Sequence, residues 1–421
     1  MIAHECLGHL ALAAAATLAL HAPPAQAASP AGESVEQILE RTLSNERSDD
    51  ALEALTRLGA DAAPFAVRWL TGHPGSPSLD PRQRELLVEA LQAWPEEPCI
   101  QAVLGALGQD PTLSERMSSV RLLGSFGGGR AVAPMCAIVR ELAVGERSHP
   151  SIAREIEDAL AGLLRRDAMA FGYLRQELQR ADNSLVECMV GALGKVPSSD
   201  SGWLLERLLG RNAKLDASVL EAYGMQGPFV ERCLDGTCSA AVRRYTSDSD
   251  AKLRRHAVVA LGRLGDTSVA PDLVRGLDDP DRRVRGASLW SLRLMTGLGW
   301  SADVERWEQH MQREEDWYKS TFPGLADDFL DADAARARSA LHKTAEHVWM
   351  RHETVPRMER ALDHEAPAVP IAMCEALTRL GGPEAMGVLR KASDHSRREV
   401  REAAQRAIEL LLARRSESAA P

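Results

Sequence analysis

The chain has 421 residues, a formal net charge of -10, 45% hydrophobic residues and only 4% aromatic residues. A chain of this length exceeds one ordinary globular core, so we expect several domains or a repeat array. The scarcity of aromatics means that Ala, Leu and Val build the interior, which suits packed helices better than β-sandwiches. The negative charge argues against a nucleic-acid binder, because phosphate contacts need an excess of Lys and Arg.

The first 27 residues have the pattern of a secretory signal peptide. A short apolar run from Leu10 to Leu20 is followed by Ala25-Gln26-Ala27, an A-x-A cleavage site. The segment before the run departs from the pattern, because it contains Glu5 and neither Lys nor Arg. No later segment is long and apolar enough to span a bilayer. We therefore expect an exported protein, periplasmic or secreted, with no integral membrane segment after cleavage.

Two pairs of segments show an internal repeat of 31 residues. Leu253 and Val284 begin one pair, and Val369 and Val400 begin the other. From each of these positions, apolar residues recur seven to eight and eleven residues further on, which is one stripe of a 3.6-residue helix. The core of the same stripe recurs from residue 54 onward, mostly 30 to 38 residues apart, with weaker copies at Ala222 and Ala340. Each spacing has room for a helix, a turn and a second helix.

The second helix of the repeat has its own signature. Ala63-Pro64 and Ala270-Pro271 are each followed by a Val-Arg pair, and proline fits the first turn of a helix because that turn has no internal N–H partner to lose. Glycines follow the first helix, where a left-handed cap favours them. These glycines are Gly59, Gly127, Gly265 and Gly381.

This pattern resembles HEAT repeats, especially the short bacterial type that also occurs in phycobilisome-lyase-like proteins, and the resemblance covers about residues 35–415. It implies an all-α, right-handed α-α superhelix, a HEAT-like or armadillo-type solenoid of helical hairpins. The expected organisation is a signal peptide (1–27), a linker with a capping helix (28–48), HEAT-like repeats (49–297), a Trp-rich acidic insertion (298–333), further repeats (334–413) and a tail (414–421).

An arginine recurs 13 to 17 residues after the landmark leucine of six repeats. These residues are Arg68, Arg140, Arg175, Arg207, Arg275 and Arg390. The resemblance implies that the second helix lines the concave side of the solenoid, so the arginines could form a basic ladder for an acidic protein partner. The alternative is that each arginine lays its stem on apolar surface and pairs with an adjacent acid.

The insertion carries three of the eight tryptophans, Trp300, Trp307 and Trp317. Between Ser301 and Asp333 it also holds ten acidic residues against three basic ones. Spaced tryptophans after a HEAT repeat are similar to extensions of other exported bacterial HEAT proteins. The insertion is either a cap that packs on the preceding repeat or an acidic, aromatic contact patch.

Candidates for chemistry are few. No G-x-S-x-G, P-loop, H-E-x-x-H or paired C-x-x-C motif occurs. Cys233 and Cys238 flank a turn-like segment and are candidates for a small disulfide in an oxidising compartment, or for two free thiols. The remaining cysteines after the signal peptide lie in helical patterns, where a buried thiol acts as a small apolar group.

Histidines and glutamates gather between residues 342 and 365. The cluster comprises His342, Glu346, His347, His352-Glu353 and His364-Glu365. HEAT-repeat iron hydroxylases use His-Glu pairs from matching positions of successive repeats, but here both dyads fall within one repeat. We therefore expect solvated histidines, no metal and no cofactor. The function expected is a non-catalytic scaffold that binds protein partners on its concave face, with a metal-dependent enzyme using His342–His364 as the alternative and an envelope spacer as a third possibility.

Overall fold

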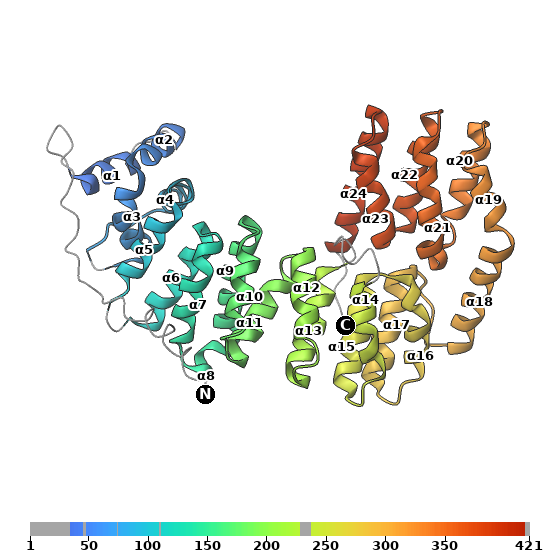
Figure 1. The fold of residues 1–421 in the computed structure, drawn as a ribbon, viewed down its shortest axis with the longest axis horizontal. Helices are drawn as coiled ribbons and strands as arrows, with labels where there is room; N and C mark the ends of the chain where they lie inside the picture. The colour runs from blue at the N-terminus through green and yellow to red at the C-terminus, as the bar shows by residue number, and fades with distance from the viewer. Residues whose placement is uncertain (1–33, 45–47, 74, 109–110, 228–236, 417–421) are drawn as a thin grey trace, which may run out of the picture. The chain divides into compact units, whose positions relative to one another are not determined.

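The computed structural model describes residues 34–44, 48–73, 75–108, 111–227 and 237–416, and within them every regular element is a helix (Figure 1). The predicted all-α fold of stacked helical hairpins is therefore confirmed. No helix in these residues is long and apolar enough to cross a membrane. The predicted signal peptide, Cys233 and the side chain of Cys238 lie outside the described part.

The chain divides into two compact units, which meet between Pro95 and Glu96. This boundary falls inside the stretch 49–297 that the sequence presents as one run of repeats. The first unit contains the helices α1 (Val35–Leu43), α2 (Ser48–Leu58), α3 (Ala63–Thr71) and α4 (Pro81–Ala93). Its helix starts are fixed by capping boxes at Ser34 and Asp80, which satisfy backbone N–H groups that have no partner within the helix.

The second unit stacks its first helices side by side. They are α6 (Leu113–Phe126), α9 (Pro150–Arg166), α11 (Asn183–Gly194), α13 (Ala213–Gln226), α15 (Ala251–Leu264) and α17 (Arg282–Thr296). The second helices form a neighbouring row of α7 (Val132–Arg140), α10 (Ala170–Glu177), α12 (Ser199–Leu208), α14 (Thr237–Arg243) and α16 (Ala270–Arg275). Two further helices, α5 (Glu96–Ala106) and α8 (Val144–Arg147), lie near the start of this unit.

The rest of the second unit begins with the insertion. It contains α18 (Val304–Ser320), α19 (Phe322–Asp328), α20 (Ala334–Thr344), α21 (Arg351–Met358), α22 (Ala368–Leu380), α23 (Gly382–Ser393) and α24 (Arg398–Ser416). The last five enclose one apolar core that also takes in Phe322 and Phe329 of the insertion. Figure 1 shows α22, α23 and α24 side by side in this part of the unit.

Three of the four glycines expected to end a first helix have a positive φ. Gly59, Gly265 and Gly381 have φ of 66°, 72° and 62°. Gly265 is a left-handed cap with ψ of 13°, whereas ψ of Gly381 is -161°, which lies outside the left-handed helical region. The prediction for Gly127 is wrong, because its φ is -68°. Glycine is needed there for space instead, since a Cβ would collide with Ala131 and press on Leu163.

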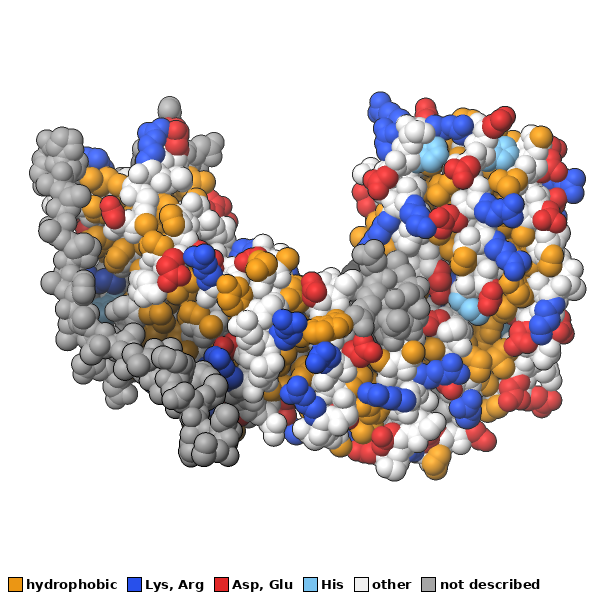
Figure 2. All heavy atoms as spheres, viewed as in Figure 1, with side chains coloured by type: hydrophobic (Ala, Val, Ile, Leu, Met, Phe, Trp, Pro, Cys, Tyr) orange, Lys and Arg blue, Asp and Glu red, His pale blue; other side chains and the backbone are white. Residues whose placement is uncertain are grey.

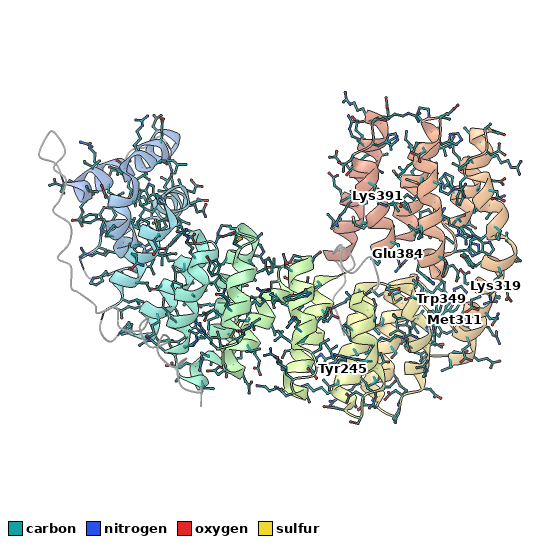
Figure 3. All side chains as sticks on the ribbon, viewed as in Figure 1. Tyr245, Met311, Lys319, Trp349, Glu384 and Lys391 are labelled. Atoms are coloured by element: carbon teal, nitrogen blue, oxygen red, sulfur yellow. The ribbon has the colours of Figure 1, made fainter. Side chains whose placement is uncertain are left out.

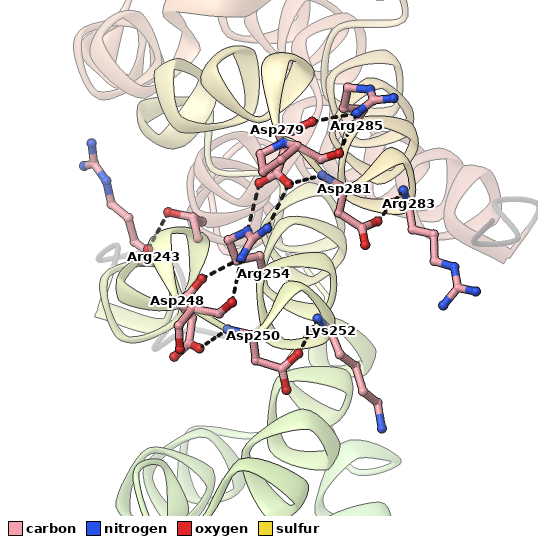
Figure 4. A network of polar contacts seen from close by, with 12 residues as sticks. Arg243, Asp248, Asp250, Lys252, Arg254, Asp279, Asp281, Arg283 and Arg285 are labelled. Carbon is pink, nitrogen blue, oxygen red and sulfur yellow. Dashed lines mark hydrogen bonds and ion pairs between the residues drawn. The ribbon is translucent and has the colours of Figure 1, made fainter.

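An aspartate and arginine network links successive repeats at one edge of the stack (Figure 4). The guanidinium of Arg254 donates to both carboxylate oxygens of Asp279 at 2.8 and 2.9 Å, and to the backbone oxygen of Asp248 at 2.8 Å. One repeat later, Arg285 makes the same kind of backbone contact as Arg254 makes with Asp248: its guanidinium donates to the backbone oxygen of Asp279 at 2.8 Å. The loop at Asp279 thus caps its own helix through Asp281 and also accepts Arg254 of the repeat before it.

Histidine replaces aspartate in the last two copies of this turn. The backbone N–H of Ala366 donates to His364 Nδ1 at 3.0 Å, as that of Asp250 does to the Asp248 carboxylate at 2.8 Å. The other ring nitrogen of His364 lies 2.9 Å from the backbone oxygen of Asp331 in the preceding repeat. His395 makes the equivalent contact with Leu362 O at 3.2 Å.

One buried arginine joins the C-terminal helices to the repeats before the insertion. Arg351 is 3% exposed and donates to the backbone oxygens of Gly265, Met295 and Leu380, which end α15, α17 and α22. Its Nε lies 3.4 Å from the carboxylate of Glu384. Gly382 has φ of 80°, and a Cβ there would collide with the guanidinium. The chain therefore needs glycine at this position to admit Arg351.

We expect Asp279→Ala to lower the free energy of unfolding by about 3 kcal/mol, because it leaves the partly buried guanidinium of Arg254 without its carboxylate. The side chains of Arg254 and Asp279 are 13% and 10% exposed. Urea denaturation followed by circular dichroism measures the loss. The control is Glu315→Ala, which breaks an exposed pair with Lys319 and should cost less than about 1 kcal/mol.

The ion pair of Arg254 and Asp279 should make the free energy of unfolding depend on pH. Hydrogen bonds from Arg254 hold the pKa of Asp279 below its ordinary value. A depressed folded pKa contributes stability above the unfolded value of about 3.9, and that stability is lost as the pH falls through the lower folded value. The wild type should therefore lose more stability below about pH 4 than Asp279→Asn does. Identical pH profiles for the two proteins would contradict this assignment.

Candidate partner-binding surface

All six predicted arginines lie in the last turn of a second helix. Arg140 and Arg275 are the last residues of α7 and α16. The other four lie within the last turn of their helices: Arg68 of α3, Arg175 of α10, Arg207 of α12 and Arg390 of α23. A cation there is stabilised by the negative end of the helix dipole, which is a physical reason for the recurrence. Arg68 belongs to the first unit and Arg390 to the C-terminal helices, so the arginine row considered below comprises Arg140, Arg175, Arg207 and Arg275.

Two members of this row are neutralised by buried acids. Arg140 forms an ion pair with Glu177, whose side chain is 6% exposed. Arg275 lies 3.1 Å from Asp272, whose side chain is 5% exposed. For these two positions the structure shows the alternative that the sequence allowed, an arginine paired with an adjacent acid.

The other two members flank a tryptophan. The guanidinium carbon of Arg207 lies 4.8 Å from the ring centroid of Trp203, and that of Arg175 lies 5.8 Å from the same ring. Both arginines are exposed, Trp203 is half-buried, and neither arginine has a carboxylate partner among the described residues. We call Arg175, Trp203 and Arg207 the Trp203 platform. It combines two positive charges with a large apolar ring.

The platform stands out against a surface of mixed charge. Figure 2 shows Lys and Arg side chains scattered among Asp and Glu side chains over the second unit, without a wide area of one sign. Within this mixture, the platform is set apart by two arginines that approach one tryptophan ring. Its attraction for an anion falls off over about 8 Å at physiological salt, so contact must be close.

Sequence reasoning missed Trp203 and one further arginine of the row. Arg243 ends α14 and lies 2.5 Å from the Asp272 carboxylate, which it shares with Arg275. It follows the landmark residue Tyr223 by 20 residues, outside the spacing of the other arginines. Trp203 lies four residues before Arg207 on α12, and a search for aromatic residues one helical turn from each arginine would have found it.

The tryptophans of the insertion pack against the rest of the second unit. Trp307 is fully buried, and its indole N–H donates to the backbone oxygen of Ser301 at 3.0 Å. Its ring centroid lies 5.0 Å from that of Trp300 and 6.2 Å from that of Trp349. Figure 3 labels Trp349 and Met311 in the region where the segment before α21 contacts α18. A ring enclosed in this way has no face for a partner, so the position of Trp307 favours the predicted cap.

Trp317 is half-buried and stacks on His347, with ring centroids 3.5 Å apart. The other contact of His347 is Glu314, whose carboxylate lies 3.1 Å from Nδ1. These residues also join α18 to the segment before α21. The C-terminal helices are therefore held in two ways, by the insertion through α18 and by the contacts of Arg351.

The predicted histidine cluster is divided among separate contacts. His352 bonds with Thr267 at 2.9 Å, His364 with the backbone of Asp331, and His342 lies 3.9 Å from Glu375. Within the described residues, no three His, Cys, Asp or Glu side chains form a group that could hold a metal ion. Burial lowers the pKa of His352, which favours a neutral ring that hydrogen-bonds within the fold.

The described cysteines are also unsuited to nucleophilic chemistry. Burial raises the pKa of Cys136, Cys188 and Cys374 to about 12 and that of Cys99 to about 11. Since the thiolate is the reactive form, these four side chains are inert near neutral pH and act as small apolar groups.

Comparison with known proteins agrees with the repeat architecture. Residues 235–318 match the family model described as HEAT repeats, so the prediction of HEAT repeats is confirmed for this part of the chain. None of the curated proteins matches the chain. Among solved structures, the crystal structure of an engineered protein is 16% identical, covers 90% of this chain and 98% of its own, and has a TM-score of 0.28. That likeness is too weak to carry an argument.

We expect Trp307→Ala to lower the free energy of unfolding by about 4 kcal/mol, because it opens a large cavity in a closed aromatic cluster. Trp300→Ala removes a half-buried ring from the same cluster and should cost less than half as much. Urea denaturation of both variants makes the comparison. An unchanged unfolding midpoint in Trp307→Ala would rule out the packing role.

Proposed function

We propose that the chain is a non-catalytic scaffold that binds an acidic segment of a partner protein at the Trp203 platform. The observation that carries the proposal is the position of two exposed arginines over one half-buried tryptophan, without a neutralising acid in the described residues. Trp and Arg are the residue types that contribute most to protein interfaces. Arginine also suits carboxylates, because its planar fork donates two parallel hydrogen bonds.

The other arginines of the row support binding at the platform rather than along the whole row. Arg140 with Glu177 on one side, and Arg243 and Arg275 with Asp272 on the other, are held by ion pairs with buried acids. These positions present little net charge to a partner. An acidic segment is therefore attracted chiefly to the platform, and apolar side chains beside its carboxylates can contact the ring of Trp203.

We expect the double variant Arg175→Glu, Arg207→Glu to weaken binding of a fluorescently labelled Glu-rich peptide by about tenfold or more, because both favourable pairs become repulsive. Fluorescence anisotropy measures the affinity. Trp203→Ala should also weaken binding although the net charge stays the same, which separates the platform from a general charge effect.

The matched control is Arg282→Glu, Arg283→Glu, which makes the same change of charge at two exposed positions of α17. This control should retain the wild-type affinity apart from a small long-range effect that added salt removes. Equal losses in the two double variants, or no loss in either, would end the proposal for the platform.

We also propose that the scaffold works outside the cytoplasm. The support is the apolar run from Leu10 to Leu20, followed by the Ala25-Gln26-Ala27 cleavage pattern. Expression in a bacterium, followed by cell fractionation and N-terminal sequencing, should give a periplasmic or secreted protein that begins at Ala28. Replacing Ala25 and Ala27 with bulky residues should block the cleavage. A cytoplasmic protein with its N-terminus intact would refute the export.

A further inference from the structure

A second feature, separate from the Trp203 platform, is a cavity of about 590 Å³ in the second unit. It lies where the C-terminal ends of α13, α15 and α17 meet α22 and α24, around the buried Arg351. Cavities of about 300–1,000 Å³ are typical of sites for small ligands and short chain ends. The junction that Arg351 holds together is therefore also large enough to admit a ligand.

The charge of the cavity lining is unusual for this protein. Arg263, Arg351 and Arg379 line it and no acidic residue does, although the chain carries a net charge of -10. Arg263 is half-buried and Arg379 is exposed, and neither has an ion-pair partner in the described part of the chain. Asp266 and Glu384 interact with Arg351, but neither lines the cavity. Two guanidinium groups are thus available to an anion.

The remaining lining is largely apolar. Met225 and Leu294 are 36% and 37% exposed, which is unusual for large apolar side chains in this fold, and both line the cavity, as does the buried Leu411. Many of the other lining residues are glycines. Because glycine has no side chain, space remains beside the arginines. A ligand that fits this lining needs a negative head and an apolar body.

We propose that this cavity binds an apolar carboxylate through Arg263 and Arg379, with the apolar body against Met225 and Leu294. A carboxylate matches the guanidinium fork, because its two oxygens accept two parallel hydrogen bonds. The chemistry is shared by a free medium-chain organic acid and by the C-terminal end of a peptide with an apolar last residue. Arg351 is already engaged with three backbone oxygens and so keeps the wall in place.

The test is isothermal titration calorimetry of the full chain with two carboxylates and their neutral analogues. Octanoate and N-acetyl-Ala-Leu with a free carboxylate are compared with octanamide and N-acetyl-Ala-Leu-amide. We expect at least one acid to bind with a dissociation constant below about 1 mM and its amide to bind at least about tenfold more weakly. Tighter binding of octanoate assigns a free acid, and tighter binding of the peptide assigns a chain end.

Variants separate the site from general attraction to positive charge. Arg263→Gln and Arg379→Gln should each weaken the acid by about fivefold to tenfold, whereas Arg283→Gln, an exposed arginine at the other end of α17, should leave its affinity unchanged. Leu294→Glu should abolish binding through repulsion, and thermal melting confirms that each variant is folded. The proposal is overturned if neither acid binds, if the amides bind as well as the acids, or if Arg283→Gln is as harmful as the cavity variants. Failure here leaves the Trp203 platform untouched, because none of these residues belongs to it.

Discussion

The second unit depends on one buried guanidinium. Arg351 donates to the backbone oxygens that end α15, α17 and α22, and these oxygens have no partner within their own helices. Burying a charge is costly unless it is paired and hydrogen-bonded. Here three backbone oxygens accept hydrogen bonds from the guanidinium, and the Glu384 carboxylate lies 3.4 Å from Nε as an ion pair. Burial in turn raises the pKa of Glu384, so this acid and Arg351 each need the other. The contact joins residues 86 positions apart in sequence, which simple stacking of neighbouring repeats does not do.

The Trp-rich insertion makes that contact possible. It places Trp307 against Trp349 and Trp317 against His347, just before Arg351 in the chain. The aromatic rings and the guanidinium therefore both hold the segment that leads into α21, the rings through apolar packing and the guanidinium through hydrogen bonds. Because the helix ends meet at Arg351 without filling the space around it, the cavity beside Arg263 and Arg379 follows from the same arrangement.

Much of the fold could be predicted from the sequence because its causes are local. The apolar stripes that begin at Leu253 and Val284 and the prolines at the start of α3 and α16 act within one repeat, and they predict the helices correctly. Contacts between repeats were harder to predict. His364 looks like a metal-ligand candidate in sequence, but in the structure it replaces Asp248 and Asp279 as the residue that caps a turn. Alignment of the turns, rather than of the helices, would have revealed this equivalence.

Equivalent arginines on the candidate surface have different neighbours, and the sequence pattern does not predict which. Arg140, Arg175, Arg207 and Arg275 occupy equivalent positions, yet Arg140 and Arg275 meet buried acids while Arg175 and Arg207 meet a tryptophan. The difference is set by the residues at 177, 203 and 272, on the same or the next second helix, and the spacing of the arginines carries no information about them. The sequence therefore predicts where the arginines lie, but not which of them are neutralised. Which of them can still attract a partner is decided by what the next helix places beside each guanidinium, and in this chain that selection leaves the Trp203 platform.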